Sequence, residues 1–438
     1  MTRPLLGSHH RRTKGEARTK APKRIRSSLS HTSMPATDSP PNAFKQTEIG
    51  LIPEEWSLEM IGDLADIKYG KANPKSSGGF PVVGSGGIYA WTHTPLVAYP
   101  TLVIGRKGTA GSVQLFEHGC YPADTTFYLD WKTEVNVRFL YFYLFANPLS
   151  GEHAKTTLPS LQRPDLENLA VPLPPLPEQR AIAHVLSKIQ AAAEAQAAIA
   201  GRARELKRAL MAKLFTEGVP SFHSGREPLK ETEIGVMPEG WEVAILNDVC
   251  LKIVDCPHTT PNFKSSGILV IRNMNVRNGR LVLAPAFYTS EDEYQERIKR
   301  LEPQEGDVLF SREAPIGEAC LVPPNTKLSL GQRMMLFRTN QSKLNSVFLV
   351  QSFYSPNVRP RMLALGTGVT AQHLNVGDVR RLKIPLPPIE EQREIARILQ
   401  VADAKIASAE RKRAGLEELF RAMLGQLMTG RVRVKGVL

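Results

Sequence analysis

Two groups of hydrogen-bond donors stand out in the sequence, each spread over several loops and strand-like segments. The first contains Arg106 and Lys107, in the glycine-rich turn 105–108, together with Thr125, Thr126, Gln162 and Arg163. The second comprises Arg272, Asn273, Asn275, Arg312, Gln332, Arg333, Thr370, Gln372 and His373. Arginine, asparagine and glutamine make bidentate hydrogen bonds to guanine and adenine edges. Both groups are therefore candidate DNA contacts.

A structural role is the alternative for these residues. Arg106 and Arg312 occupy equivalent positions at an offset of 206, and for this pair a structural salt bridge and a DNA contact remain equally open. Thr370 likewise corresponds to Thr157 at an offset of 213. For most of the other candidates, taken singly, the structural role is the simpler interpretation.

Motifs for catalysis are missing from the sequence. It has no GxxxxGK[ST] phosphate loop, no Asn/Asp-Pro-Pro-Tyr/Phe motif of an amino-methyltransferase and no HExxH or C-x-x-C metal spacing. The glycine run 84–87 lacks the third glycine and the βαβ context of a dinucleotide site. We expect no catalytic site, metal or cofactor in this chain.

Charge is concentrated in a short arm. The chain has 438 residues and a net charge of +13, and residues 1–33 hold nine basic residues and one acidic residue, which leaves +5 for the rest. We expect residues 1–43 to form a disordered basic arm, either a nonspecific DNA-binding tail or, the simpler interpretation, a dispensable extension ahead of Met34. The four scattered cysteines predict reduced thiols in a cytoplasmic protein, and no apolar run is long enough for a membrane span.

An internal repeat organises the remainder of the chain. Lys45–Trp56 returns as Lys230–Trp241 with eight of twelve positions identical, at an offset of 185. Val171–Ile189 returns as Ile384–Ala402 with ten of nineteen identical, at an offset of 213. The second unit therefore has 28 more residues between the two repeated segments. Both units have the same order of parts: an opening with a tryptophan, a globular part, and a proline-rich step into a helix.

Between the repeated segments, residues 45–170 and 230–383 predict globular parts of mixed α/β structure. The predicted strands and short helices are 101–105, 112–116, 126–129 and helix 136–146 in the first part, and 267–272, 307–310, 334–338 and helix 344–354 in the second. We expect Trp56 and Trp241 to anchor the start of each part.

A long helix follows each globular part. Segments 171–177 and 384–388 predict polyproline-like extended steps, followed by helices 178–215 and 390–428 within the regions 171–218 and 384–429. Apolar residues recur every three or four positions in both, which predicts an antiparallel coiled coil about 57 Å long with the globular parts at its opposite ends. Gly201 and Gly415 predict a kink or a close helix–helix approach.

This doubled arrangement resembles the specificity (S) subunit of a type I restriction-modification enzyme. The resemblance rests on the two TEIG-x-x-P-E-x-W openings, on the two PLPP-x-x-EQR steps, and on segments 80–87, 105–108 and 124–128, which look like one class of target recognition domain. It covers residues 45–430 and leaves out the basic arm.

The resemblance implies an α+β fold with a pseudo-two-fold internal repeat and two target recognition domains, each of which reads half of a bipartite, asymmetric sequence in double-stranded DNA. It also implies that the helices set the gap between the half-sites and dock partners, which would be two methyltransferase subunits and a restriction subunit. S-adenosylmethionine and the chemistry would belong to those partners. The alternative is a coiled-coil scaffold without sequence-specific DNA reading.

Overall fold

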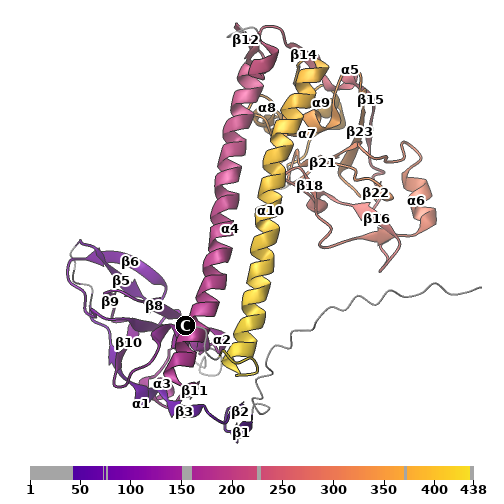
Figure 1. Ribbon diagram of the computed structural model, residues 1–438. Coiled ribbons are helices and arrows are strands. Elements are labelled where there is room, and N and C mark those ends of the chain that lie inside the picture. Colours follow the sequence, from indigo (N-terminus) through magenta and orange to yellow (C-terminus); the bar gives the residue numbers. More distant parts are fainter. Residues whose placement is uncertain are drawn as a thin grey trace, which may run out of the picture.

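The computed structural model describes residues 43–72, 74, 77–149, 160–223, 228–368 and 372–434. Two globular parts lie at opposite ends of a pair of long helices that run side by side in opposite directions (Figure 1). These helices are α4 (Leu176–Glu217) and α10 (Ile389–Met428). The predicted basic arm falls outside the described residues, apart from residue 43. Within the described part of the chain, no helix is long and apolar enough to cross a membrane.

The first globular part is built on a four-stranded antiparallel sheet in the order β4-β10-β7-β8. The central strand β7 (Thr101–Gly105) is buried at all five positions. The other elements are β1 (Phe44–Thr47), β2 (Gly50–Pro53), β3 (Ser57–Met60), α1 (Ile61–Leu64), β4 (Ala65–Tyr69), β5 (Phe80–Gly84), β6 (Gly87–Thr92), β8 (Val113–Phe116), β9 (Tyr121–Pro122), β10 (Thr126–Trp131), α2 (Val137–Ala146), α3 (Arg163–Glu167) and β11 (Ala170–Leu173).

The second globular part repeats this plan with the sheet β15-β23-β20-β21. Its elements, beginning with a short 3-10 turn after α4, are η1 (Pro220–Phe222), β12 (Leu229–Thr232), β13 (Gly235–Pro238), β14 (Glu242–Ile245), α5 (Leu246–Val249), β15 (Cys250–Asp255), β16 (Ile268–Ile271), η2 (Asn273–Asn275), β17 (Val276–Arg277), β18 (Arg280–Leu281), β19 (Tyr288–Thr289), α6 (Glu291–Arg297), β20 (Val308–Ser311), β21 (Ala319–Leu321), β22 (Leu328–Leu330), β23 (Met334–Thr339), α7 (Ser346–Tyr354), α8 (Arg359–Ala364), α9 (Val376–Arg380) and β24 (Lys383–Leu386).

Local sequence explains the two short helices that the repeat predicted. Asn136 precedes α2 and its side chain accepts a hydrogen bond from the backbone N–H of Phe139. Asn345 does the same for Phe348 at the start of α7. Asparagine is a favoured N-cap because its oxygen satisfies a backbone donor that the first turn leaves unpaired. The same cap therefore starts the equivalent helix in each unit.

The proline-rich steps before the long helices are extended, and each begins as a short strand, β11 or β24. Pro175 and Pro388, directly before the helices, have φ and ψ angles of −53° and 144° and of −50° and 143°, close to those of polyproline. β11 pairs antiparallel with β3, and β24 pairs antiparallel with β14. Pro172 lies opposite Leu58, and Pro385 lies opposite Val243. Proline is tolerated because a two-stranded sheet has only edge strands. Each pairing ties the end of a globular part to its beginning just before the long helix starts.

Gly201 and Gly415 do not mark a close approach of the two helices. Both helices run unbroken through these positions, and a Cβ atom added to either glycine would meet nothing within 4 Å. The prediction of a close approach was therefore wrong. Ion pairs join the helices nearby, between Arg204 and Glu410 and between Lys207 and Asp403.

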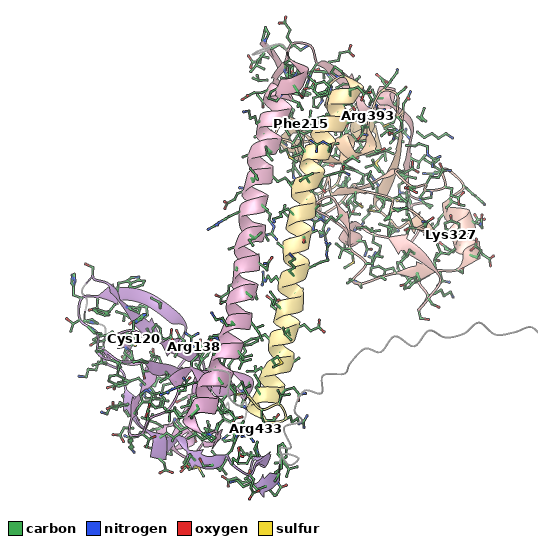
Figure 2. All side chains as sticks on the ribbon, in the orientation of Figure 1. Cys120, Arg138, Phe215, Lys327, Arg393 and Arg433 are labelled. Atoms are coloured by element: carbon green, nitrogen blue, oxygen red, sulfur yellow. The ribbon has the colours of Figure 1, made fainter. Side chains whose placement is uncertain are left out.

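Each long helix ends in the core of the other unit's globular part. Leu424, Leu427 and Met428 of α10 belong to the core that contains Trp56. Met211, Leu214 and Phe215 of α4 belong to the core that contains Trp241. Figure 2 shows Phe215 and Arg433 near the two opposite ends of the helix pair. Because these apolar side chains are buried at both ends, the helix pair fixes the distance between the globular parts.

Candidate nucleic-acid interface

Arg106 is the centre of the first group of candidates. It follows β7 directly, and its guanidinium carbon lies 5.2 Å from the ring centroid of Tyr69 and 6.0 Å from that of Phe127. Its Nη2 donates to the carbonyl oxygen of Asp124 at 2.9 Å. Stacking on aromatic faces restricts the guanidinium to one plane. The half-buried arginine is therefore held in a fixed orientation at the end of the sheet.

Lys107, Thr125 and Gln162 lie beside Arg106. The carbonyl oxygen of Thr125 accepts from the backbone N–H groups of Arg106 and Lys107, at 2.9 and 3.2 Å. Lys107 forms a β-bridge with Ser160, and Gln162 Nε2 donates to the Ser160 hydroxyl at 3.0 Å. Lys107 and Gln162 are exposed. Three chain segments thus meet and present donors to solvent on one surface.

Two members of the first group are placed differently. Thr126 is fully buried, and its hydroxyl donates to the carbonyl oxygen of Ala123 at 2.7 Å. Arg163 is exposed, but its Nε binds Glu167 Oε1 at 2.7 Å on its own short helix. The position of Thr126 favours a structural role, in which it closes the turn before β10.

Sequence reasoning missed the aromatic residues of this surface. Tyr69 is 50% exposed and Tyr89 is 57% exposed. A Cβ atom on Gly84 would lie 3.3 Å from the Tyr89 ring and 3.7 Å from the Thr125 hydroxyl, so Tyr89 stands next to the polar cluster. The signal was available, since a tyrosine follows the glycine run 84–87 and aromatic side chains alternate with donors in nucleic-acid sites.

The second group of candidates also gathers at the end of a central strand, around the loop after β20. Asn273 Nδ2 donates to the carbonyl oxygen of Ala314 at 2.7 Å. Arg333 Nε lies 2.6 Å from Glu313 Oε2, and Glu313 forms a β-bridge with His373. These contacts bring four separate chain segments together.

Arg272 and Gln332 extend the second cluster. The Arg272 guanidinium lies 4.8 Å from the Phe287 ring centroid and 5.5 Å from that of Phe263. Gln332 Nε2 donates to the carbonyl oxygen of His258 at 3.2 Å. Arg272 is thus packed on aromatic rings as Arg106 is, although the two positions are not equivalent in the repeat. Gln372 is exposed beside His373.

Arg312 and Asn275 are placed inside the protein. Arg312 is 9% exposed, and its Nη1 donates to the carbonyl oxygen of Leu374 at 2.9 Å. Asn275 is 1% exposed, and its Nδ2 donates to the carbonyl oxygens of Val282 and Pro285. Burial favours the structural alternative for both. Thr370 and its counterpart Thr157 lie outside the described residues.

Equivalent positions carry opposite charges in the two clusters. Lys107 and Glu313 are related by the offset of 206, and their bridge partners Ser160 and His373 are related by the offset of 213. Lysine binds guanine O6 and N7, whereas a glutamate accepts from cytosine N4. The backbone frame is therefore shared while the side-chain chemistry differs, since Lys107 is exposed and Glu313 is paired with Arg333.

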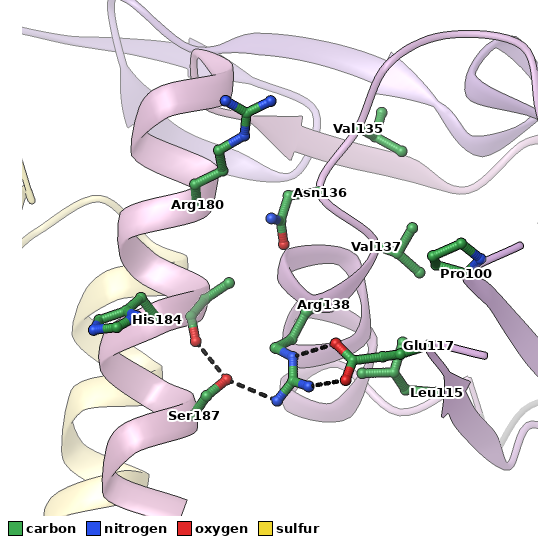
Figure 3. A pocket seen from close by; sticks show the side chains of 11 residues that line it. Pro100, Leu115, Glu117, Val135, Asn136, Val137, Arg138, Arg180, His184 and Ser187 are labelled. Carbon is green, nitrogen blue, oxygen red and sulfur yellow. Dashed lines mark hydrogen bonds and ion pairs between the residues drawn. The ribbon is translucent and has the colours of Figure 1, made fainter. Parts of the chain in front are cut away.

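Outside these clusters, one cavity lies where the first globular part packs against the long helix α4. In the cavity of about 470 Å³ drawn in Figure 3, Arg138 of α2 binds Glu117 and donates to the Ser187 hydroxyl of α4 at 3.0 Å. The arginine thus ties the first globular part to the long helix. In the part of the chain that the structure describes, no group of three or more histidine, cysteine, aspartate or glutamate side chains could hold a metal ion.

Known proteins resemble this chain in sequence and in fold. The sequence model of the family described as "Type I restriction modification DNA specificity domain" matches residues 53–200 and 238–418. The type I restriction enzyme MjaVIII specificity subunit of Methanocaldococcus jannaschii is 26% identical over 90% of this chain and 97% of its own length. The EcoBI specificity subunit of Escherichia coli is 24% identical over 64% of this chain and 62% of its own length.

A solved structure agrees with the fold. The S subunit of the type I restriction-modification system from M. genitalium superimposes with a TM-score of 0.60 at 15% identity, over 85% of this chain and 96% of its own. The family model matches the chain twice, once in each repeat, as the doubled motifs predicted. The chain therefore belongs to the type I restriction modification DNA specificity family, which comprises the specificity subunits of type I restriction-modification enzymes.

Proposed function

We propose that this chain is the noncatalytic subunit that reads a bipartite, asymmetric target in double-stranded DNA. Residues 45–170 read one half-site and residues 230–383 read the other. The regions 171–218 and 384–429 pair as an antiparallel coiled coil in a pseudo-two-fold frame. That frame docks two methyltransferase subunits and a restriction subunit in a cytoplasmic complex. The chain carries no cofactor of its own, and S-adenosylmethionine binds to the methyltransferase subunits.

The observation that carries this proposal is the contrast between a shared frame and divergent surfaces. In both units a buried tryptophan donates a hydrogen bond to the equivalent glutamate of a long helix. Both units also have a loop rich in hydrogen-bond donors at the end of a central strand. Yet that loop carries an exposed Lys107 in one unit and, in the other, Glu313, which is paired with the exposed Arg333. A scaffold needs no such divergence, whereas two different DNA half-sites require it.

The exposed and half-exposed members of the two clusters are the proposed contacts. They are Arg106, Lys107, Thr125, Gln162 and Arg163 in the first, and Arg272, Asn273, Gln332, Arg333, Gln372 and His373 in the second, with Tyr69 and Tyr89 added to the first. Thr126, Asn275 and Arg312 support these surfaces from inside.

A domain exchange tests the proposal. Residues 230–383 are replaced by the corresponding segment of another family member, and the chain is expressed with its methyltransferase subunits. Sequencing of methylated adenines should show a motif with one half changed and the other retained. The reciprocal exchange of residues 45–170 should change the other half. A change of both halves by either exchange, or the absence of any bipartite motif, would contradict the proposal.

A further inference from the structure

A polar cluster joins the second globular part to both long helices well away from the helix ends. Asp403 of α10 receives both Lys207 Nζ of α4, at 2.8 Å from each carboxylate oxygen, and Gln351 Nε2 of α7, at 3.0 Å. Gln351 is only 4% exposed. One carboxylate therefore links the two helices to the globular part.

A hairpin of the second globular part reaches the same place. Strands β17 and β18 are joined by Asn278 and Gly279, whose φ angles of 48° and 81° are those of the two-residue turn that Asn-Gly favours. Directly after this turn, Arg280 Nη1 binds Glu410 Oε2 at 3.0 Å and its Nη2 donates to the carbonyl oxygen of Asp403 at 2.6 Å. Arg204 of α4 binds the other oxygen of Glu410.

The second globular part is thus attached to α10 from the first turn of the helix as far as Glu410, with Leu399 and Asp403 among the contacts in between. At the start of the helix, Trp241 donates to Glu391 and the backbone N–H of Asn345 donates to Gln392. Glu410 lies 19 residues further on, which is about 28 Å along the helix at 1.5 Å per residue. Of these contacts, the one at Glu410 lies furthest from the start of the helix, so it opposes tilting of the globular part with the longest lever arm.

The first globular part has an apolar contact at the equivalent place. Phe142 of α2 corresponds to Gln351 of α7, counted from the two asparagine caps, and Phe420 corresponds to Lys207 at the offset of 213. The rings of Phe142 and Phe420 meet at 5.8 Å. Ring packing tolerates small shifts, while charge-assisted hydrogen bonds require defined distances and angles.

We propose that Arg280 is a positioning residue that, through Glu410 and the Asp403 carbonyl, fixes the orientation of the second globular part on the helix pair and so makes the complex selective for one spacer length between the half-sites. This inference rests on the proposed function. Arg280 and Glu410 are 34% and 39% exposed, so their pair adds little to the stability of the fold. The pair matters for geometry instead, because a tilt of the second globular part would move the DNA-reading surface of that part along the duplex.

The test uses the full chain with its methyltransferase subunits, and the readout is the spacer of the methylated motif. With Arg280→Ala, both half-site sequences should stay the same, while selectivity for the preferred spacer over spacers one base pair longer or shorter falls about tenfold. Arg280→Lys keeps one charged donor and should restore part of the selectivity. Arg413→Ala removes an exposed ion pair with Glu417 on the same helix and should leave the spacer unchanged.

Glu410→Gln tests the same link from the helix side and should also broaden the spacer. Retention of one spacer length by both Arg280→Ala and Glu410→Gln overturns the inference, and so does a complete loss of methylation by these variants when they still melt like the wild type. If the wild-type complex methylates no bipartite motif, the proposed function itself fails. The two failures are therefore distinguishable.

Discussion

The indole Nε1 of Trp56 donates a hydrogen bond to Oε2 of Glu178 at 3.2 Å, across 122 residues of chain. Trp241 and Glu391 repeat this contact at 2.9 Å in the second unit. In both cases the glutamate lies in the first turn of a long helix, where a negative charge also interacts favourably with the helix dipole. The buried pair therefore fixes the beginning of a globular part to the beginning of the helix that follows it.

The first junction is closed by the C-terminal segment. Arg433 Nε binds Glu178 Oε1 at 2.6 Å, and the Arg433 guanidinium carbon lies 5.8 Å from the Trp56 ring centroid. Glu178 is 6% exposed, and the Arg433 side chain is 8% exposed. The second junction uses His223 instead, whose Nε2 lies 2.8 Å from Glu391 Oε1. Each glutamate thus holds a tryptophan and a basic side chain together.

Removal of this glutamate should destabilise the first globular part. Glu178→Ala leaves the Trp56 indole N–H without its acceptor and removes the buried partner of Arg433, so we expect a loss of about 3 kcal/mol in the free energy of unfolding. Glu55, which also binds Arg433 but is 56% exposed, serves as the control, and Glu55→Ala should cost less than about 1 kcal/mol. Urea denaturation measures both, and equal losses would contradict the prediction.

The repeat in the sequence predicted which positions are equivalent but could not predict their burial. Arg106 and Arg312 align in the repeat. The carbonyl oxygen of Arg106 accepts a hydrogen bond from the backbone N–H of Leu161, and that of Arg312 accepts one from the backbone N–H of Leu374. Only Arg312 turns its guanidinium inward to Leu374. The choice depends on side-chain packing between segments far apart in sequence, which no local pattern encodes.

The regular elements, in contrast, could be predicted from the sequence. The strand predicted at 101–105 matches β7, and the predicted helices match α2, α7, α4 and α10 to within a few residues. The contacts of Tyr69, Phe263 and Phe287 with arginines could not be predicted, because these rings lie in other chain segments than the arginines. Their role depends on tertiary contact alone.

The two aligned arginines should therefore respond differently to alanine. Arg106→Ala should weaken binding to the first half-site by about 1–3 kcal/mol and leave the melting temperature nearly unchanged, since this side chain is half-buried at a surface. Arg312→Ala should lower the melting temperature by several degrees, because it leaves the Leu374 carbonyl without this donor and opens a cavity. Fluorescence anisotropy with specific and random duplexes, together with thermal melting, separates the two effects. An early melt of Arg106→Ala with an unaltered Arg312→Ala would reverse the assignment.

Two buried cysteines, Cys120 and Cys320, and the half-buried Cys250 should make the fold sensitive to alkaline pH. Burial raises the pKa of the Cys120, Cys250 and Cys320 thiols to about 12. In the unfolded chain a thiol releases its proton near pH 8.5. Above that pH the unfolded state binds fewer protons than the folded state, so stability falls as pH rises from about 8.5 towards 12 and is unaffected by these groups below that range.

Each of these thiols should lower the free energy of unfolding by about 1.4 kcal/mol per pH unit within that window. Urea denaturation at pH 7.5 and 9.5 measures the combined slope. Cys320→Ala should be less stable at both pH values because it leaves a cavity, but its slope with pH should be shallower. An identical slope in this variant would show that other groups carry the pH dependence.

The length of the helix pair should set the spacer between half-sites. An insertion near residues 210–215 is unsuitable, because Met211, Leu214 and Phe215 belong to the core of the second globular part. Residues 198–200 of α4 and 412–414 of α10 lie between the ends instead, next to the Arg204–Glu410 pair that joins the helices. Four residues inserted into both helices at these places lengthen the pair without entering either core.

The added length sets the size of the change. Four residues add about 6 Å to the helix pair. Along the duplex, 6 Å is nearly two base pairs at about 3.4 Å each. The preferred spacer should therefore grow by one or two base pairs while both half-site sequences stay the same.

Methylation of duplexes that differ only in spacer length is the measurement. The control is the same insertion in α4 alone, because a single lengthened helix must bulge. If the double insertion keeps the original spacer, the partner subunits rather than this helix pair hold the two reading surfaces apart.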